Sequence, residues 1–233
     1  MKQKIVEAMF AMVVVFVMGT AARAVDESAV RIMPLGDSIT FGTPNPSYGG
    51  YRNLLEKLLA QEGSKVEFVG SQESGVGVLR YPANEGHPGW TINRIKNGID
   101  KQGWLERAQP DIVLLHIGTN NFRLHQAQSV DTDLSALLDD ILERLPRANV
   151  IVAQIIPFRN GLGRLQRVYD AAIPEIAASK GRRVSVVNLS NVLPPGDYAD
   201  MFHPSSDGYD KMARVWARAI RPVMNRRTRV SDL

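Results

Sequence analysis

The feature that most constrains the fold is a regular alternation of short apolar runs with longer amphipathic segments. Such alternation is typical of parallel strands joined by helices that cover both faces of a sheet. The apolar runs predict five strands, at residues 30–35, 65–71, 111–118, 149–157 and 183–190. Helical periodicity predicts the connecting helices, at residues 51–63, 91–108, 129–146, 162–181 and 206–224. We therefore expect one α/β domain, a three-layer α/β/α sandwich with a central parallel sheet of about five strands.

Two of the predicted helices contain residues that disturb a regular helix. Gly98 and Gly103 fall within the segment 91–108, and Pro174 falls within the segment 162–181. Glycine and proline both disfavour a helix interior. We therefore expect the first helix to be broken and the second to be kinked. Residues 71–89 are rich in Gly, Pro, Ser and Asn and predict a long loop.

The first 24 residues have the composition of a segment that directs export. Lysines precede an apolar stretch from Ala8 to Met18, and Ala22-Arg23-Ala24 forms a small-residue A-x-A pattern. This arrangement predicts a signal peptide over residues 1–24 and a single domain over residues 25–233, with an uncleaved anchor as the alternative. The apolar stretch is shorter than the roughly 20 residues of a membrane span. We expect a secreted or periplasmic protein that has no membrane partner after cleavage.

Composition and missing motifs exclude several classes of function. The chain has no cysteine, which excludes disulfides and thiolate metal sites. Its formal net charge of +4 fits a solvated basic surface or attraction to an anionic polymer. The sequence contains no nucleic-acid-binding signature, Walker loop, H-E-x-x-H motif or G-x-S-x-G elbow. We expect no nucleic-acid partner and no metal or organic cofactor, and the oligomeric state stays open.

Polar residues that could carry chemistry follow four of the predicted strands. Gly-Asp-Ser at 36–38 follows the first strand, and Gly-Thr-Asn-Asn at 118–121 follows the third. The loop after the second strand ends in Gly-His-Pro-Gly-Trp-Thr at 86–91, and the loop after the fifth strand contains Asp200 and His203. Because the carboxyl ends of parallel strands meet at one edge of a sheet, we expect these segments to lie together.

This set of residues fits the requirements of ester hydrolysis. A serine hydroxyl needs a neighbouring base, and a histidine base needs a carboxylate that orients its ring. Ser38 is the candidate nucleophile, His203 the base, and Asp200, three residues before it, the orienting acid. The backbone N–H groups of Ser38 and Gly89 and the side-chain amide of Asn120 are candidate donors to an oxyanion.

Each of these residues also has a structural interpretation. Ser38 could cap a helix, Gly89 could serve a turn, and Asn120 could bind loop backbone groups. Asp200 and His203 could form an ordinary surface turn. Their occurrence together, at matching strand ends, favours the catalytic interpretation.

Four sequence blocks carry a resemblance to a known family. GDSIT at 36–40, GHPGWTI at 86–92, HIGTNN at 116–121 and DYADMFHPSSDGYDKMA at 197–213 resemble, in this order, the blocks of the SGNH hydrolases, the GDSL-like lipase/esterase superfamily. The resemblance covers essentially the whole chain after residue 24 and implies a flavodoxin-like fold. It implies the same triad and the same three oxyanion donors. Asn121 departs from the pattern, because the family usually has Asp there, and we expect a local structural effect.

Within the superfamily, RIMPLGDSIT, YGGYR and EGHPGWTI look most like the acetyl xylan esterase branch, carbohydrate esterase family 3. That likeness implies an acetylated polysaccharide or another small ester as substrate. The candidate substrate-binding residues are Asp37, Tyr48, His87, Trp90 and Asn121. Aromatic faces suit sugar stacking, although Trp90 could equally pack the sheet and His87 could cap a turn.

Three functions remain open from the sequence. The first is a secreted serine esterase that removes acetyl groups from xylan or a related glycan. The second is the same chemistry on lipids, thioesters or aryl esters. The third is a glycan-binding module without catalytic activity, and the intact set of Ser38, Asp200 and His203 argues against it.

Overall fold

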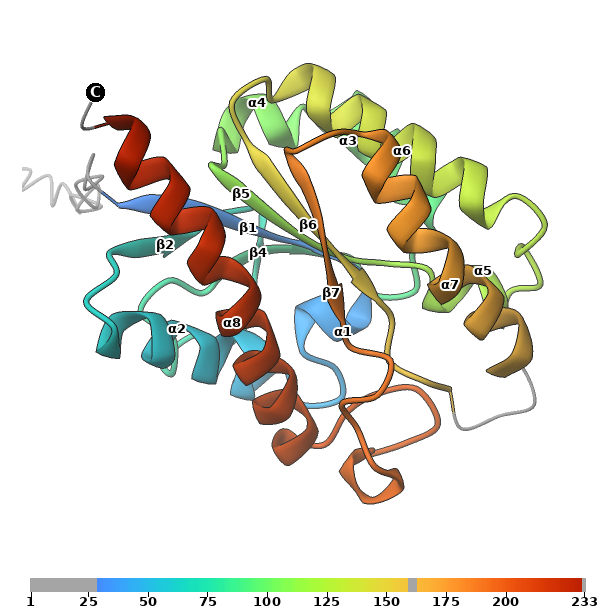
Figure 1. Cartoon of the computed structure of the whole chain (residues 1–233). Coiled ribbons are helices and arrows are strands. Elements are labelled where there is room, and N and C mark those ends of the chain that lie inside the picture. Colours follow the sequence, from blue (N-terminus) through green and yellow to red (C-terminus); the bar gives the residue numbers. More distant parts are fainter. Residues whose placement is uncertain (1–28, 159–162, 232–233) are drawn as a thin grey trace, which may run out of the picture.

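The structure is a computed structural model that describes residues 29–158 and 163–231 (Figure 1). The predicted signal peptide, residues 1–24, lies outside the described residues. Within the described part, none of the helices combines the length and the apolar character that crossing a bilayer requires.

The described chain alternates strands and helices as the sequence predicts. The strands are β1 (Val30–Gly36), β2 (Val66–Phe68), β3 (Gln72–Glu73), β4 (Ala83–Gly86), β5 (Ile112–His116), β6 (Asn149–Gln154) and β7 (Val184–Asn188). The helices are α1 (Ser38–Phe41), α2 (Tyr51–Gln61), α3 (Ile92–Gln102), α4 (Trp104–Ala108), α5 (Thr119–Arg123), α6 (Val130–Arg144), α7 (Gly163–Ser179) and α8 (Ser206–Ser231). Two 3₁₀ turns, η1 (Pro46–Tyr48) and η2 (Pro195–Asp197), complete the described elements.

The five strands predicted from the sequence form the parallel body of the sheet, in the order β2-β1-β5-β6-β7. Numbered along the chain, this is the order 2-1-3-4-5 of flavodoxin-like folds. The predicted three-layer α/β sandwich is confirmed. The direction of the strand order reverses between β1 and β5, and in such sheets ligands bind beyond the carboxyl ends of the strands at that point.

The sheet has seven strands in the described residues, not about five. The two additional strands, β3 and β4, lie inside the predicted loop 71–89. β1 is longer than its neighbour β2, so its second half pairs with β4 through Leu35–Glu85 and Gly36–Gly86. β4 (Ala-Asn-Glu-Gly) has no apolar run. Backbone pairing with β1, which a hydrophobic pattern does not reveal, stabilises it as a strand.

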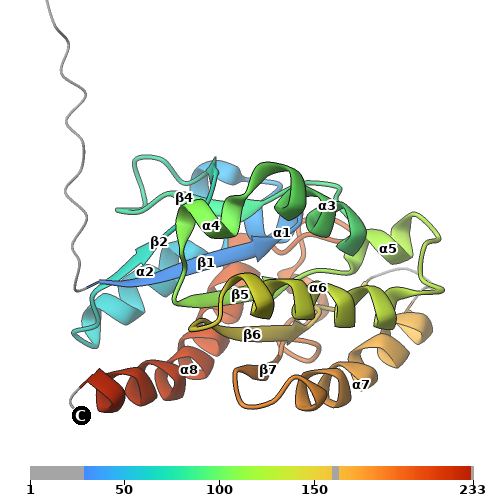
Figure 2. The ribbon, with the colours of Figure 1, turned by 90° about the horizontal axis from the view of Figure 1, so that it is seen from above.

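Helices cover both faces of the sheet (Figures 1 and 2). α2 and α8 pack side by side on one face, and α3, α4, α6 and α7 cover the other. The apolar stripe predicted for α2 is present, since Leu55 and Leu59 are fully buried. β5 is buried along its whole length, as expected for a central strand covered on both faces.

Gly98 does not break a helix, contrary to the expectation from the sequence. α3 continues through Gly98 and ends at Gly103, which has a left-handed φ of 58°. A Cβ atom at Gly98 would lie 2.2 Å from the ring of Trp104. The glycine therefore permits the close packing of Trp104 against α3. Pro174 lies inside α7, which continues through it as a helix.

Candidate active site

The turn after β1 holds Ser38 at the carboxyl edge of the sheet. Gly36 ends the strand, and a Cβ atom there would lie 2.1 Å from the backbone oxygen of His116, so only glycine permits this approach of β1 to β5. Asp37 caps α1, because its Oδ1 accepts a hydrogen bond from the Ile39 N–H at 3.0 Å. The cap is therefore Asp37 and not Ser38. The Ser38 hydroxyl is left for another partner.

That partner is His203. The Ser38 Oγ lies 2.9 Å from His203 Nε2, and His203 Nδ1 lies 2.7 Å from Asp200 Oδ2. Both distances are hydrogen-bond lengths. A neutral imidazole that donates from Nδ1 to the carboxylate has an Nε2 lone pair that faces the serine hydroxyl. The structure thus brings the three predicted triad residues into one hydrogen-bonded chain.

Asp200 and His203 are held by their own short loop. Asp200 Oδ1 accepts hydrogen bonds from the Phe202 N–H at 2.7 Å and from the His203 N–H at 2.8 Å. Partial burial raises the pKa of Asp200, but the hydrogen bonds from Phe202 and His203 outweigh it and hold that pKa below its usual range. Asp200 is therefore a carboxylate at neutral pH, suited to stabilise a positively charged imidazole.

A pocket of about 290 Å³ opens in front of Ser38 and His203. Its other lining residues are Thr43, Pro88, Gly89, Thr119, Asn120, Arg123 and Phe202. Gly89 has a left-handed φ of 80°, and a Cβ atom added to it would meet no heavy atom within 4 Å. Glycine is therefore favoured here by the backbone conformation, and the space beside it is open to a ligand.

The side chain of Asn120 is fixed from two directions. Its Nδ2 donates to the Trp90 carbonyl oxygen at 2.9 Å, and its Oδ1 accepts from Arg123 Nε at 3.0 Å. The guanidinium can only donate and the carbonyl can only accept, so a flipped amide would lose both bonds. Nδ2 carries a second hydrogen, available to a group in the pocket that Asn120 lines. Two of the predicted oxyanion donors, Gly89 and Asn120, thus lie beside Ser38.

Arg123 is a site residue that the sequence patterns did not predict. This arginine is the last residue of α5, three positions after Asn120, and lies on the wall of the pocket. A spacing of three residues on a helix places two side chains together. The spacing of three residues between Asn120 and Arg123 is present in the sequence. It indicates that the two side chains act together at the site only once Asn120 is known to line the pocket.

Three of the predicted substrate-binding residues are buried parts of the scaffold, which corrects that prediction. Asp37 is 0% exposed and caps α1. Asn121 is 1% exposed; its Oδ1 accepts from the Ile92 N–H and its Nδ2 donates to the Gln126 carbonyl oxygen. His87 stacks on Trp90 and Trp104, with ring centroids 4.3 and 4.5 Å away. Polar side chains near an active edge resemble substrate ligands in sequence, but here they satisfy buried backbone groups and pack aromatic rings.

The other two predicted substrate-binding residues lie outside the lining of the pocket at Ser38. The Tyr48 hydroxyl donates to Asp210 Oδ1 at 2.5 Å. Trp90 contributes its carbonyl to Asn120, and its partly buried ring lines a neighbouring pocket beside α3.

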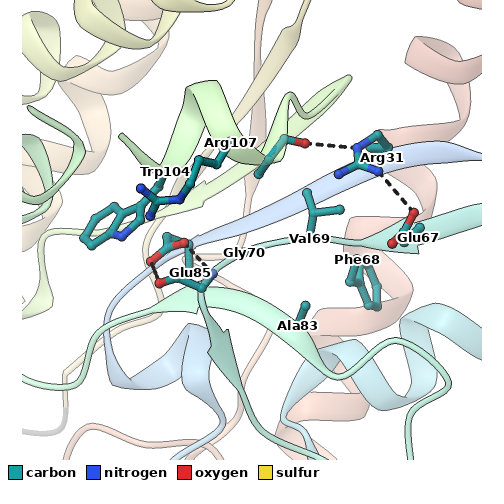
Figure 3. A pocket seen from close by; sticks show the side chains of 11 residues that line it. Arg31, Glu67, Phe68, Val69, Gly70, Ala83, Glu85, Trp104 and Arg107 are labelled. Carbon is teal, nitrogen blue, oxygen red and sulfur yellow. Dashed lines mark hydrogen bonds and ion pairs between the residues drawn. The ribbon is translucent and has the colours of Figure 1, made fainter. Parts of the chain in front are cut away.

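Behind the 87–90 turn, Glu85 anchors the stacked rings. Its carboxylate is fully buried, accepts from the Ser71 N–H and Oγ, both at 2.7 Å, and lies 2.6 Å from His87 Nε2. Glu85 and Trp104 line one side of a separate pocket of about 260 Å³, with Arg31 and Glu67 on the other side (Figure 3). Arg31 already pairs with Glu67 and with the Ala108 carbonyl oxygen. The charged groups of this pocket are engaged with one another and with the backbone.

The buried carboxyl group of Asp37, the residue before Ser38, has an unusual environment. Burial raises the pKa of Asp37 to about 6 from an ordinary value of 3.8, against the opposing effects of the Ile39 N–H and of His203. A low-polarity environment disfavours the charged form of a carboxyl group. The folded protein therefore binds a proton at Asp37 more tightly than the unfolded chain does.

The fold and the site define a flavodoxin-like α/β protein in which a chain of hydrogen bonds joins Ser38, His203 and Asp200 at the carboxyl edge of the sheet. The model of the GDSL-like Lipase/Acylhydrolase family matches residues 35–211. The chain therefore belongs to this family of esterases and acylhydrolases.

The chain is similar to several esterases and to an acetylhydrolase subunit. A family 3 carbohydrate esterase of Clostridium thermocellum has a similar structure, with 35% sequence identity and a TM-score of 0.76 over 84% of this chain and 98% of that one. A multidomain esterase of Ruminococcus flavefaciens is 30% identical over 220 residues, which are 82% of this chain and 28% of the relative. A platelet-activating factor acetylhydrolase IB subunit beta homolog of Drosophila melanogaster is 31% identical over 130 residues, 54% of each protein. The chain thus spans only a part of these two curated relatives.

Proposed function

We propose that this protein is a secreted serine esterase that hydrolyses acetyl esters on xylan or a related polysaccharide. The observation that carries the proposal is the hydrogen-bonded chain from Ser38 through His203 to Asp200 at the wall of an open pocket. The roles of the individual residues, the substrate and the export are all parts of this proposal.

In the first step, Ser38 Oγ attacks the acyl carbonyl carbon while His203 Nε2 takes the hydroxyl proton. The carbonyl oxygen becomes an oxyanion. The Ser38 and Gly89 N–H groups and Asn120 Nδ2 donate to it. The ester C–O bond then breaks, and the departing alcohol takes the proton from His203. An acetyl group remains on Ser38.

In the second step, water attacks the acetyl carbonyl carbon and passes a proton to His203 Nε2. The same donors hold the new oxyanion. The bond from the acyl carbon to Ser38 Oγ breaks, the serine oxygen takes the proton from His203, and acetic acid leaves. Asp200 stays ionised throughout and stabilises the imidazolium that forms in each step.

Arg123 acts as a positioning residue in this mechanism. Its bond to Asn120 Oδ1 holds the amide so that Nδ2 points to the Trp90 carbonyl oxygen and the pocket. A charged donor on the amide oxygen also draws electron density from the amide, which makes its N–H groups stronger donors. The oxyanion donor is therefore both fixed and polarised before substrate binds.

We propose an acetylated glycan as the substrate because this chain is similar to the family 3 carbohydrate esterase. The match covers nearly all of that esterase's structure. The likeness to a platelet-activating factor acetylhydrolase subunit supports a second candidate, the hydrolysis of short acyl esters on lipids by the same residues. Export is proposed from the signal-peptide pattern of residues 1–24.

The test is acetate release from acetylated xylan, measured beside hydrolysis of p-nitrophenyl esters of increasing acyl length. The Ser38→Ala variant is the control, checked for folding by circular dichroism. We expect acetate release that the substitution abolishes, and rates that fall steeply beyond short acyl chains. Hydrolysis of the p-nitrophenyl esters without acetate release from the xylan would favour the lipid esterase. Full activity of Ser38→Ala would refute the serine mechanism for both candidates.

A further inference from the structure

A second pocket lies beside the candidate active site, next to the turn at residues 89–90. It has a volume of about 320 Å³ and is lined by Trp90, Arg94, Asn97, Gly98, Lys101 and Gln102. Gly89 lines the pocket at Ser38 and Trp90 lines this one. The Cα atoms of consecutive residues are only about 3.8 Å apart. A polymeric substrate bound at Ser38 can therefore extend into the pocket beside α3.

The indole ring of Trp90 gives this pocket a fixed aromatic wall. One face of the ring packs on His87, with centroids 4.3 Å apart and planes inclined by 23°, while the side chain as a whole remains partly exposed. Glu85 holds His87 in turn, at 2.6 Å. Gly98 lets the ring approach α3, because a Cβ atom there would lie 2.8 Å from Trp90. A rigid, partly exposed aromatic surface suits the apolar face of a sugar ring.

The charged side chains that line this pocket are both cationic. Arg94 and Lys101 are exposed, and in the described chain neither takes part in a hydrogen bond or an ion pair. Among the described residues, no carboxylate lines the pocket. Asp100, also on α3, is already paired with Lys96 at 3.2 Å and with Arg144 at 2.5 Å. The exposed amide side chains of Asn97 and Gln102 add neutral donors and acceptors.

We propose that the pocket beside α3 is a subsite for an acidic sugar unit, a uronate, of the same polysaccharide whose ester is cleaved at Ser38. The proposal rests on the proposed esterase function and specifies its substrate as an anionic glycan. Trp90 stacks on the sugar ring, Asn97 and Gln102 bind its hydroxyl groups, and Arg94 and Lys101 attract its carboxylate. The two pockets then bind adjacent sugar units of one polysaccharide.

The experiment compares two forms of one polymer. Acetylated glucuronoxylan is assayed beside the same preparation after its uronic acid side groups have been removed, and p-nitrophenyl acetate reports the chemistry at Ser38. The test variant is Arg94→Gln/Lys101→Gln. The matched control is Lys57→Gln/Arg218→Gln, which removes the same charge from exposed positions on α2 and α8, in the opposite helical layer.

We expect the wild type to prefer the uronate-bearing polymer by about three- to tenfold in kcat/KM, the range for two exposed charge contacts. The test variant should lose this preference, whereas the control variant should keep it. All three proteins should hydrolyse p-nitrophenyl acetate equally. The absence of any preference in the wild type, or its survival in the test variant, would overturn the subsite.

Failure of the subsite can be told from failure of the proposed function. A wild type that releases acetate equally from both polymers is a glycan esterase without an acidic subsite. A wild type that hydrolyses p-nitrophenyl acetate but neither polymer is not a xylan esterase, and the subsite falls with that function. Affinity electrophoresis of Ser38→Ala in gels containing each polymer checks binding independently of turnover. Equal retardation by the two polymers would also overturn the subsite.

Discussion

The side of the candidate site around Ser38, the proposed nucleophile, is buried and is called the nucleophile side, whereas the loop that holds the proposed acid and base lies at the surface. Ser38 is 8% exposed and Asn120 is 4% exposed. The side chains of Asp200 and His203 are 46% and 18% exposed. The nucleophile side joins the ends of β1 and β5 with the 87–90 turn, segments far apart in the sequence. The Asp200–His203 loop satisfies its own hydrogen bonds within four residues.

This difference means that the two sides should respond differently to substitution. The surface loop carries chemistry and little of the packing, so its variants should lose activity and keep stability. The buried side carries both, because each polar group there also satisfies a neighbouring buried group. Activity and unfolding free energy, measured together on each variant, therefore test whether the buried side and the surface loop differ in this way.

The largest effect is expected for His203→Ala. Loss of the base should lower kcat/KM for p-nitrophenyl acetate by at least about 10⁴-fold, as for other groups that act as a catalytic unit. The unfolding free energy in urea should change by less than about 0.5 kcal/mol, since the side chain lies in a surface loop. The double variant Ser38→Ala/His203→Ala should be no slower than either single variant. Additive losses would show that the two residues do not act as a unit.

The next effect is expected for Asn120→Ala on the buried side. Removal of one oxyanion donor should lower kcat by about 10²- to 10³-fold with little change in KM. Unlike His203→Ala, this variant should also be less stable, by about 1–3 kcal/mol, because the Trp90 carbonyl loses its donor. A fall in activity without a fall in stability would contradict the assignment of both roles to Asn120.

The two sides should also differ in the sign of their pH dependence. Burial raises the pKa of Asp37 to about 6 from 3.8 in the unfolded chain. Asp37 therefore favours the folded state below about pH 4, and this contribution is lost as the pH rises through about 6. The loss is at most about 3 kcal/mol, from 1.36 kcal/mol per pKa unit. The pKa of Asp200 is lowered instead, so its contribution is present at neutral pH and is lost in acid.

Urea titrations from about pH 2 to pH 8 check this contrast, because the contribution of Asp200 is lost only below the ordinary carboxyl pKa of 3.8. Asp37→Asn keeps an acceptor for the Ile39 N–H, and its amide does not titrate. The variant therefore lacks the loss described for Asp37 and should gain stability relative to the wild type as the pH rises. Asp200→Asn should show the opposite trend, with a deficit that disappears in acid. Parallel curves for the wild type and Asp37→Asn would mean that Asp37 titrates alike in the folded and unfolded states.

The same contrast explains what could be predicted from the sequence. The strand and helix alternation specifies the three layers, because each apolar run must be covered on both faces. The pairing of Asp200 with His203 is local and could be proposed from a spacing of three residues. The roles of His87 and Asn121 could not, since the same side chains serve equally as ligands or as partners of buried groups. β4 was missed for a similar reason, because its pairing with β1 depends on strand lengths and not on an apolar pattern.

The smallest effect concerns Arg123, which is exposed but acts on the buried side through Asn120. Arg123→Ala should lower kcat by about tenfold, equivalent to about 1.4 kcal/mol, the usual size of one charge-assisted hydrogen bond. KM for p-nitrophenyl acetate should change little, because the polarised amide acts on the oxyanion and not on the bound ester. Arg123→Lys should recover part of the rate, because an ammonium group at this position also donates to Asn120.

A double-mutant cycle distinguishes positioning from a general effect of charge near the pocket. If Arg123 acts through the Asn120 amide, Arg123→Ala should have almost no effect on kcat in the Asn120→Ala background. A tenfold loss that persists in that background would mean that the guanidinium stabilises the transition state directly. The proposal that Arg123 acts on the oxyanion through the Asn120 amide would then be wrong. The hydrogen bond between Arg123 and Asn120 would still account for the orientation of the amide.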